Sequence, residues 1–130
     1  MNEICEIMDI SKELNEEQQV AAYHLQGPLL VLAGAGSGKT RCVTYRIANL
    51  INQGVSPDSI LGLTFTNKAA REMRERVLHL LDHRVVHETP LMKTFHSLGV
   101  YILRRFSREA GLKKDFAILD SNDSMKLVKE

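Results

Sequence analysis

The sequence predicts an α/β fold in which helices flank a parallel sheet. Three short apolar runs occupy residues 28–33, 60–65 and 91–95, and apolar residues at helical spacings of three and four follow each run. The runs begin about 30 residues apart, which is the span of one strand–helix–strand unit. Strands that alternate with helices in this way are typical of a parallel sheet with helices on its faces.

The composition predicts a single soluble domain. The 130 residues are 44% hydrophobic and 25% charged, which is ordinary for a globular protein. No apolar run approaches the roughly 18 residues that a membrane span needs, and the acidic start of the chain lacks the basic region of a secretory signal. Cys5 and Cys42 have no metal-like spacing. We therefore expect two reduced thiols in a cytoplasmic protein that has no membrane partner.

Positive charge gathers in the second half of the chain. Residues 1–65 contain four Lys or Arg and seven Asp or Glu, a net charge of −3, whereas residues 66–130 contain thirteen and nine, a net charge of +4. A basic half is typical of proteins that bind nucleic acid through its phosphates. The alternative is a solvated helix face, which the interleaved acids Glu72 and Glu75 favour.

A helix is expected before the first apolar run. Asn15 is suited to be its N-cap, and Gln18 follows at the spacing of a capping box. Val20 and Ala21 begin an apolar side, and the helix is expected to stop at Gly27.

The first apolar run leads into AGAGSGKT, residues 33–40, which has the pattern of a phosphate-binding loop except that Ala33 replaces the first glycine. The glycines let backbone N–H groups turn toward phosphates, and the following helix directs its positive end to the same place. Lys39 is expected to reach the β- and γ-phosphates, and the Thr40 hydroxyl to complete a Mg²⁺ shell. A simple glycine-rich turn is disfavoured because a predicted strand and a predicted amphipathic helix flank the loop.

An amphipathic helix is expected after each apolar run. The expected buried positions are Val43 and Ile47 after the first run, Ala70, Met73 and Val77 after the second, and Leu98, Ile102 and Phe106 after the third.

Asp120 is the only candidate for the carboxylate that holds Mg²⁺ and orients water in phosphate-loop hydrolases, because it follows four apolar residues. The favoured alternative is that Asp120 or Ser121 caps the short helix that follows. That helix has no stop signal before Glu130, which is the pattern of a truncated chain.

Three histidines, His79, His83 and His87, are spaced by four residues, and a continuous helix would place them on one face as metal ligands. Pro90 indicates that the helix ends before His87, so we expect no metal site there.

Four segments together carry a resemblance to a known family. LNEEQQVAA (14–22), AGAGSGKTR (33–41), TFTNKAAREMRERV (64–77) and TFHSLGVYILRR (94–105) occur in order, and they resemble the N-terminal part of UvrD/Rep/PcrA-type superfamily 1 DNA helicases. The resemblance covers nearly the whole chain. It implies a RecA-like P-loop NTPase fold and an ATP-driven enzyme that moves 3′ to 5′ on single-stranded DNA and separates the duplex in DNA repair and replication restart.

The resemblance also implies a domain organisation. Residues 1–110 are expected to form the first part of the RecA-like ATP-binding lobe, and residues 111–130 the start of an inserted helical subdomain. The acidic Mg²⁺ motif, the second lobe and the arginines that sense the γ-phosphate are expected to be missing. The full-length parent is therefore expected to hydrolyse ATP and unwind DNA, with repair proteins as partners. This chain alone is expected to do neither and at most to bind nucleotide weakly.

The resemblance assigns ATP-binding roles by position. Gln18 matches a glutamine that reads the adenine edge, which suits an amide that donates and accepts at once; the alternative is its capping box, and both roles are compatible. Arg41 matches an arginine near the adenine and is otherwise a surface residue. The expected ATP-binding residues are Gln18, Ala33, Gly34, Ala35, Gly36, Ser37, Gly38, Lys39, Thr40 and Arg41, with Lys39 and Thr40 catalytic and Thr40 the Mg²⁺ ligand.

The resemblance likewise assigns single-stranded DNA contacts to the two TF segments. Phe65 is expected to stack on a base, and Asn67 and Lys68 to meet phosphates; Thr94 and His96 are the candidates in the second segment. Each has a structural alternative: Phe65 as a core residue, Asn67 as the N-cap of the next helix, and His96 as an ordinary loop residue.

Two alternatives from other classes stay open. One is a small self-contained phosphate-loop kinase that uses Asp120, which a phosphorylated product would identify. The other is a DNA-binding module without catalysis, whose DNA affinity neither Lys39→Ala nor added nucleotide would change. Within the family, a helicase–nuclease subunit of the recombination type is also open, because its nuclease motifs would lie downstream. The sequence does not indicate an oligomeric state.

Overall fold

The computed structural model describes residues 10–81 and 89–129. The chain divides into two compact units, one that ends at Phe95 and one that begins at His96. Among the described residues, no helix is long and apolar enough to cross a membrane. The predicted domain boundary after residue 110 stays a prediction.

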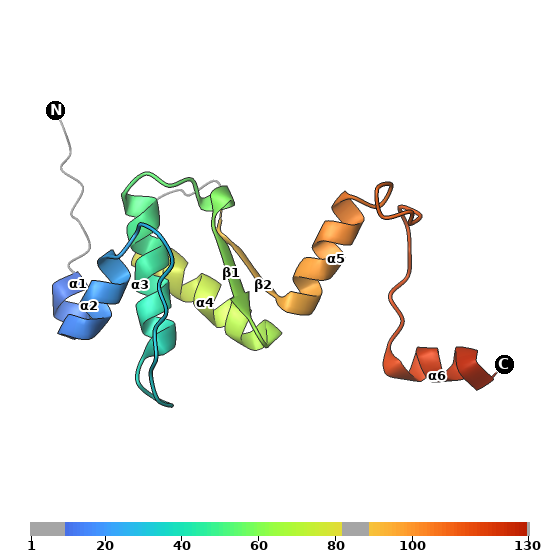
Figure 1. The fold of residues 1–130 in the computed structure, drawn as a ribbon, viewed down its shortest axis with the longest axis horizontal. Helices are drawn as coiled ribbons and strands as arrows, with labels where there is room; N and C mark the ends of the chain where they lie inside the picture. Colours follow the sequence, from blue (N-terminus) through green and yellow to red (C-terminus); the bar gives the residue numbers. More distant parts are fainter. Residues whose placement is uncertain (1–9, 82–88, 130) are drawn as a thin grey trace. The chain divides into compact units, whose positions relative to one another are not determined.

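The first unit alternates helices with two paired strands. Its elements are α1 (Ile10–Glu13), α2 (Glu16–Tyr23), α3 (Lys39–Asn52), the 3₁₀ turn η1 (Pro57–Ser59), β1 (Leu61–Thr64), α4 (Asn67–Leu80) and β2 (Leu91–Thr94) (Figure 1). The strands are parallel, with Leu61 opposite Leu91 and Thr64 opposite Thr94. Helix α4 packs against both strands and against α3, which in turn packs against α2. The predicted mixture of helices with parallel strands is therefore confirmed for this unit.

The predicted first strand, residues 28–33, is not a strand in the structure. This segment runs as an extended arm between α2 and α3 (Figure 1), and Leu30 and Leu32 are 80% and 85% exposed. An extended segment becomes a strand only when a neighbour accepts its backbone hydrogen bonds. Within the described ranges, the sheet consists of β1 and β2 alone, and neither pairs with the arm. The prediction was wrong because local composition reports burial propensity and not the presence of a pairing partner.

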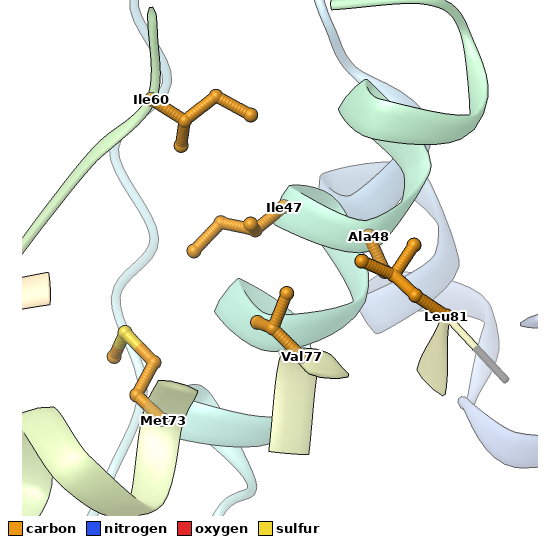
Figure 2. Packing of buried hydrophobic residues seen from close by; sticks show 6 residues of the cluster. All are labelled: Ile47, Ala48, Ile60, Met73, Val77 and Leu81. Atoms are coloured by element: carbon orange, nitrogen blue, oxygen red, sulfur yellow. The ribbon is translucent and has the colours of Figure 1, made fainter. Parts of the chain in front are cut away.

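The core of the first unit lies between α3, α4 and the start of β1. It consists of Ile47, Ala48, Ile60, Met73, Val77 and Leu81, whose side chains point toward one another in Figure 2. Burial of one such aliphatic side chain contributes about 1.5–3 kcal/mol. The predicted face of α4 is confirmed, because Ala70, Met73 and Val77 are all buried. On α3, Ile47 is buried as predicted, whereas Val43 is 40% exposed.

Polar side chains of α3 attach α2 to this core. The amide of Asn49, which is buried, donates to the carbonyl of Ala22 at 3.2 Å, and Arg46 donates to the carbonyl of Ala21 at 3.0 Å. Both carbonyls belong to the last turn of α2, where carbonyls lack partners within the helix. Ala21 is buried as predicted, but Val20 is 70% exposed. The helix ends at Tyr23, four residues before the predicted stop.

The second unit contains α5 (Phe95–Arg105), which starts at the junction, and α6 (Ser121–Lys129). The predicted apolar face of α5 is not buried, since Ile102 is 45% exposed and Phe106 49%. Asp120 caps α6, because its carboxylate accepts from the backbone N–H of Asp123 at 2.8 Å. The favoured capping role of Asp120 is thereby confirmed.

Of the three histidines in the series, only His79 lies among the described residues, so the expectation of no metal site stays a prediction. Helix α4 ends at Leu80, and His79 in its last turn is exposed. His83 and His87 lie outside the described residues. No group of three or more His, Cys, Asp or Glu side chains that could hold a metal occurs among residues 10–81 and 89–129.

Candidate functional site

The glycine-rich loop ends where α3 begins. Gly36 and Gly38 have φ values of +73° and +81°, in the left-handed region that glycine adopts without strain. The Ser37 hydroxyl donates to the carbonyl of Gly34 at 2.6 Å, which closes the turn. Gly38 is the N-cap of α3 and offers no side-chain hydrogen bond. The N–H groups of the first turn therefore have no side-chain cap at the positive end of the helix.

Lys39 lies across this loop. Its ammonium donates to the carbonyls of Ala33 at 2.9 Å and Gly34 at 2.6 Å. An ammonium has three donors, so one remains for another acceptor. Thr40, beside it, is exposed, and its hydroxyl makes no hydrogen bond to another described residue. A positive charge and a hydroxyl thus stand together at the start of α3.

Gln18 connects the loop to α2. Its Oε1 accepts from the backbone N–H of Asn15 at 3.1 Å, and Asn15 Oδ1 accepts from the backbone N–H of Gln18 at 2.9 Å, which is the predicted capping box. Its Nε2 donates to the carbonyl of Ser37 at 3.0 Å. A Cβ at Gly38 would lie 2.7 Å from this Nε2, so a larger residue at position 38 would displace the amide. One side chain therefore fixes the position of the loop relative to α2.

A cavity of about 500 Å³ lies between α2, the arm and the start of α3. Its walls combine apolar side chains of the arm with polar groups of the loop. They include Gln18, Val20, Leu30, Leu32, Lys39 and Cys42. A site with apolar walls and a few polar groups at one end is typical of small-molecule pockets.

Two other residues of α3 border the loop. Arg41 forms an ion pair with Glu13, and its guanidinium lies 5.9 Å from the ring centre of Tyr45. It lines a second cavity of about 580 Å³ between α3 and α4, apart from the first. The thiol of Cys42 donates to the carbonyl of Gln18 at 3.6 Å, and burial raises its pKa while the charge of Arg46 opposes that rise.

Two aromatic rings meet at the carboxyl end of the strands. Phe65 is 92% exposed and Phe95 is 56% exposed, and their ring centres are 5.8 Å apart at an interplanar angle of 44°. The register explains the contact, because Thr64 and Thr94 are opposite one another and each precedes one ring. The alternative of Phe65 as a core residue is therefore wrong. Polar side chains and ligands commonly meet at this edge of parallel sheets.

The remaining candidates at the strand ends differ in exposure. Thr66, and not Asn67, is the N-cap of α4, because its hydroxyl accepts from the N–H of Ala69 at 3.1 Å. Asn67 is exposed in the first turn of α4. Lys68 is also exposed, and its Nζ lies 3.8 Å from Oε1 of Glu72. Thr94 is buried, with 7% of its surface exposed. His96 is exposed and belongs to the second unit.

A model of the UvrD/REP helicase N-terminal domain family matches residues 14–130. The chain belongs to this family. The chain is also similar to proteins named ATP-dependent DNA helicase PcrA. The one from Staphylococcus epidermidis is 48% identical over 120 residues, 92% of this chain, and one from Staphylococcus aureus is 48% identical over 118 residues, 90% of this chain. The chain spans about 16% of the length of these two relatives.

For this UvrD/REP family chain, the structure brings Gln18, the loop and Lys39 together at one cavity and places Arg41 beside another. It adds three features that sequence reasoning missed. The arm lines the cavity as an exposed wall, the Gln18 amide bonds to Ser37, and Phe95 packs on Phe65. Only the last had a sequence signal, since the pair TF recurs at the end of both strands.

Proposed function

We propose that this chain is the nucleotide-binding part of an ATP-dependent DNA helicase with a RecA-like P-loop fold. The observation that carries the proposal is the cluster of Lys39 and the glycine loop at the uncapped end of α3, beside a cavity of about 500 Å³. Helix N-termini with glycine-rich loops bind phosphates, because their N–H groups and dipole are directed at the anion. Membership of the UvrD/REP family supports ATP as the nucleotide.

Each loop residue has a physical role in this proposal. The Lys39 ammonium exchanges its carbonyl partners at Ala33 and Gly34 for the β- and γ-phosphates, which are stronger acceptors because they are charged. The backbone from Ala33 to Gly38, which includes Ala35, surrounds the phosphates. The base enters the cavity near Gln18. Arg41 acts near the adenine only if it leaves Glu13 and Tyr45.

Mg²⁺ fits this site with one protein ligand. The Thr40 hydroxyl is exposed and uncommitted, and hydroxyl oxygen suits a hard cation. Mg²⁺ is commonly bound through few protein oxygens together with substrate phosphates. When bound, the ion supplies charge neutralisation to the phosphates.

The same proposal assigns single-stranded DNA to the strand ends. Phe65 offers a nearly fully exposed ring for base stacking, which tolerates any sequence. The amide of Asn67 is available for phosphate because Thr66 performs the capping. Lys68 adds positive charge there. Thr94 is buried and directly precedes Phe95, so we assign it a role in positioning that ring, and His96 is a candidate on the second unit.

Unwinding with 3′ to 5′ polarity in DNA repair, and a cytoplasmic location, are proposed for the whole protein and rest on the family. We propose that this chain by itself binds nucleotide without hydrolysing it. Its candidate for a water-positioning carboxylate, Asp120, already caps α6. The same contact weakens the kinase alternative, which needs Asp120 as a catalytic group.

ATP turnover by this chain, with Mg²⁺ and with or without single-stranded DNA, tests the proposal. We expect bound nucleotide and no turnover above that of Lys39→Ala. A phosphorylated small-molecule product would select the kinase. DNA-stimulated turnover that disappears in Lys39→Ala would contradict the assignment of the water-positioning group to residues outside this chain.

A further inference from the structure

Arg41 belongs to the first turn of α3, but its side chain does not line the first cavity. Gly38, Lys39 and Cys42 line that cavity, whereas Arg41 lines the second. Two residues of helix turn through about 200°, so Lys39 and Arg41 leave α3 on nearly opposite sides. The two cations at the start of α3 therefore have different surroundings.

Two contacts hold the Arg41 guanidinium in place. Its Nη2 donates to Oε2 of Glu13, the last residue of α1. Its Cζ lies 5.9 Å from the ring centre of Tyr45, about one turn further along α3, which is within the range of a cation–π contact. Arg41 is thus shared between an acid and a ring, and neither belongs to the glycine loop.

Burial beside these contacts fixes the positions of both partners. Tyr45 is buried in one cluster with Leu14 and Ala22. Glu13 directly precedes Leu14, so its backbone is tied to the same cluster. The carboxylate and the ring that hold Arg41 are therefore carried by a packed part of the first unit.

The pairing with Glu13 changes the charge that an anion would meet at the loop. The first turn of α3 contains no acidic residue, and its formal charge comes from Lys39 and Arg41. In the described part of the chain, the Lys39 ammonium bonds to two neutral carbonyls and so keeps its full charge. Arg41 is paired with a carboxylate, which cancels most of its attraction for an anion further away.

The ion pair is exposed enough to exchange partners. The side chains of Arg41 and Glu13 are 48% and 53% exposed. Ion pairs in such surroundings are weak and are screened by salt. A bound nucleotide offers a guanidinium either a phosphate charge or an aromatic ring, and it can therefore compete with Glu13 for Arg41.

We propose that Glu13 restrains Arg41 and thereby lowers the affinity of the chain for nucleotide. Arg41 has to leave Glu13 before it contacts a bound nucleotide, and a site that is only partly in its competent state binds more weakly by that fraction. The proposal rests on the proposed function and concerns the regulation of the same site. Glu13 is a positioning residue in it, because it acts through Arg41.

Titration calorimetry with ATP and Mg²⁺ on the 130-residue chain tests the restraint. Glu13→Gln removes the charge of the carboxylate and keeps the size of the side chain. Glu16→Gln is the matched control, because Glu16 is an exposed acid in the first turn of α2 and has no ion pair with another described residue. Arg41→Gln, alone and combined with Glu13→Gln, shows whether the effect passes through Arg41. Circular dichroism checks that each variant is folded.

We expect Glu13→Gln to raise the affinity for ATP about two- to fivefold at low salt, which is the range that an exposed ion pair supports. The gain should shrink toward none at about 0.5 M salt, because screening already weakens the pair in the parent. Glu16→Gln should change the affinity by less than about 1.5-fold, and so should the Glu13 substitution when Arg41 is already glutamine.

Unchanged or lower affinity in Glu13→Gln would overturn the restraint, and a lower affinity would mean that the pair supports the site. An equal gain in Glu16→Gln, or in the Arg41→Gln background, would also overturn it, because the cause would then be long-range charge and not the release of Arg41.

The same titrations separate this proposal from the nucleotide site itself. If Lys39→Ala weakens ATP binding and Glu13→Gln leaves it unchanged, the restraint is overturned and the nucleotide site stands. If neither the parent nor Glu13→Gln binds ATP, the nucleotide site is contradicted and the restraint falls with it.

Discussion

Replacing Gln18 by glutamate should loosen the phosphate loop without uncapping α2. Glutamate keeps an oxygen that can accept from the Asn15 N–H, which Oε1 now does at 3.1 Å. It lacks the Nε2 donor that bonds to the Ser37 carbonyl at 3.0 Å. Alanine at the same position removes both contacts. The pair of variants therefore separates the loop contact from the cap.

The expected magnitudes follow from these contacts. One net hydrogen bond contributes about 0.5–1.5 kcal/mol, and the bond to Ser37 is exposed, so the lower part of that range applies. Since about 1.4 kcal/mol corresponds to a tenfold change, nucleotide affinity should fall about two- to fivefold in Gln18→Glu. Gln18→Ala should show a similar loss and also lower the free energy of unfolding by about 1 kcal/mol, because half of the capping box is gone.

Titration calorimetry with ATP and with GTP is the assay, and thermal unfolding followed by circular dichroism measures stability. The change in GTP affinity distinguishes a role of Gln18 in the loop from a role at the adenine. Because the Ser37 contact acts on the loop, Gln18→Glu should weaken GTP as well as ATP. A loss for ATP alone would mean that Gln18 acts only on the adenine. No loss for either nucleotide would refute the loop contact altogether.

Three further predictions concern packing, capping and DNA. Val77→Ala should lower the free energy of unfolding by about 2 kcal/mol, because the Val77 side chain has no exposed surface. Val128→Ala, at a position that is 84% exposed, should leave that free energy almost unchanged. Equal Tm shifts in the two variants would contradict the assignment of Val77 to the core. Thr66→Ala should destabilise the chain by about 1 kcal/mol, because it removes the hydroxyl that caps α4, and Asn67→Ala should destabilise it by much less. If chemical denaturation gives the reverse order, Asn67 is the cap. Phe65→Ala should lower the affinity for single-stranded DNA about fivefold or more, measured by fluorescence anisotropy. Unchanged affinity would mean that Phe65 does not stack on a base.

The elements with strong local signals could be predicted from the sequence. The spacing of Ala70, Met73 and Val77 specified the buried face of α4, and Asn15 with Gln18 specified the cap of α2. Both signals are local, since they depend on residues three or four positions apart. The parallel pairing of β1 and β2 followed from strand–helix alternation.

The failures involve information that lies elsewhere in the chain. Residues 28–33 have a strand composition, but a strand also needs a neighbour, which local composition does not report. Thr66 and Asn67 are both suitable caps, and the choice depends on where the backbone leaves the extended region; Thr66, with φ −126° and ψ 148°, is the last extended residue. The bond from Gln18 to Ser37 spans nineteen positions in sequence and has no local pattern.

The sequence could predict a phosphate-binding type of loop at residues 33–40, but not the hydrogen bonds that the loop makes. The glycines predicted a loop whose backbone can turn, and of those in the loop Gly36 and Gly38 adopt positive φ values. The carbonyl partners of Lys39 depend on how the arm returns along α3, which the motif does not specify.

Equilibrium binding of ATP with Mg²⁺ to the parent chain and to Lys39→Ala tests the central claim most directly. A hydrogen bond to a charged group contributes about 1.5–3 kcal/mol, so affinity should fall at least about tenfold in the variant. Lys126→Ala, which removes the same charge from an exposed position on α6, is the control and should bind as the parent does. Equal affinity of the parent and Lys39→Ala would contradict the assignment of the loop as a nucleotide site.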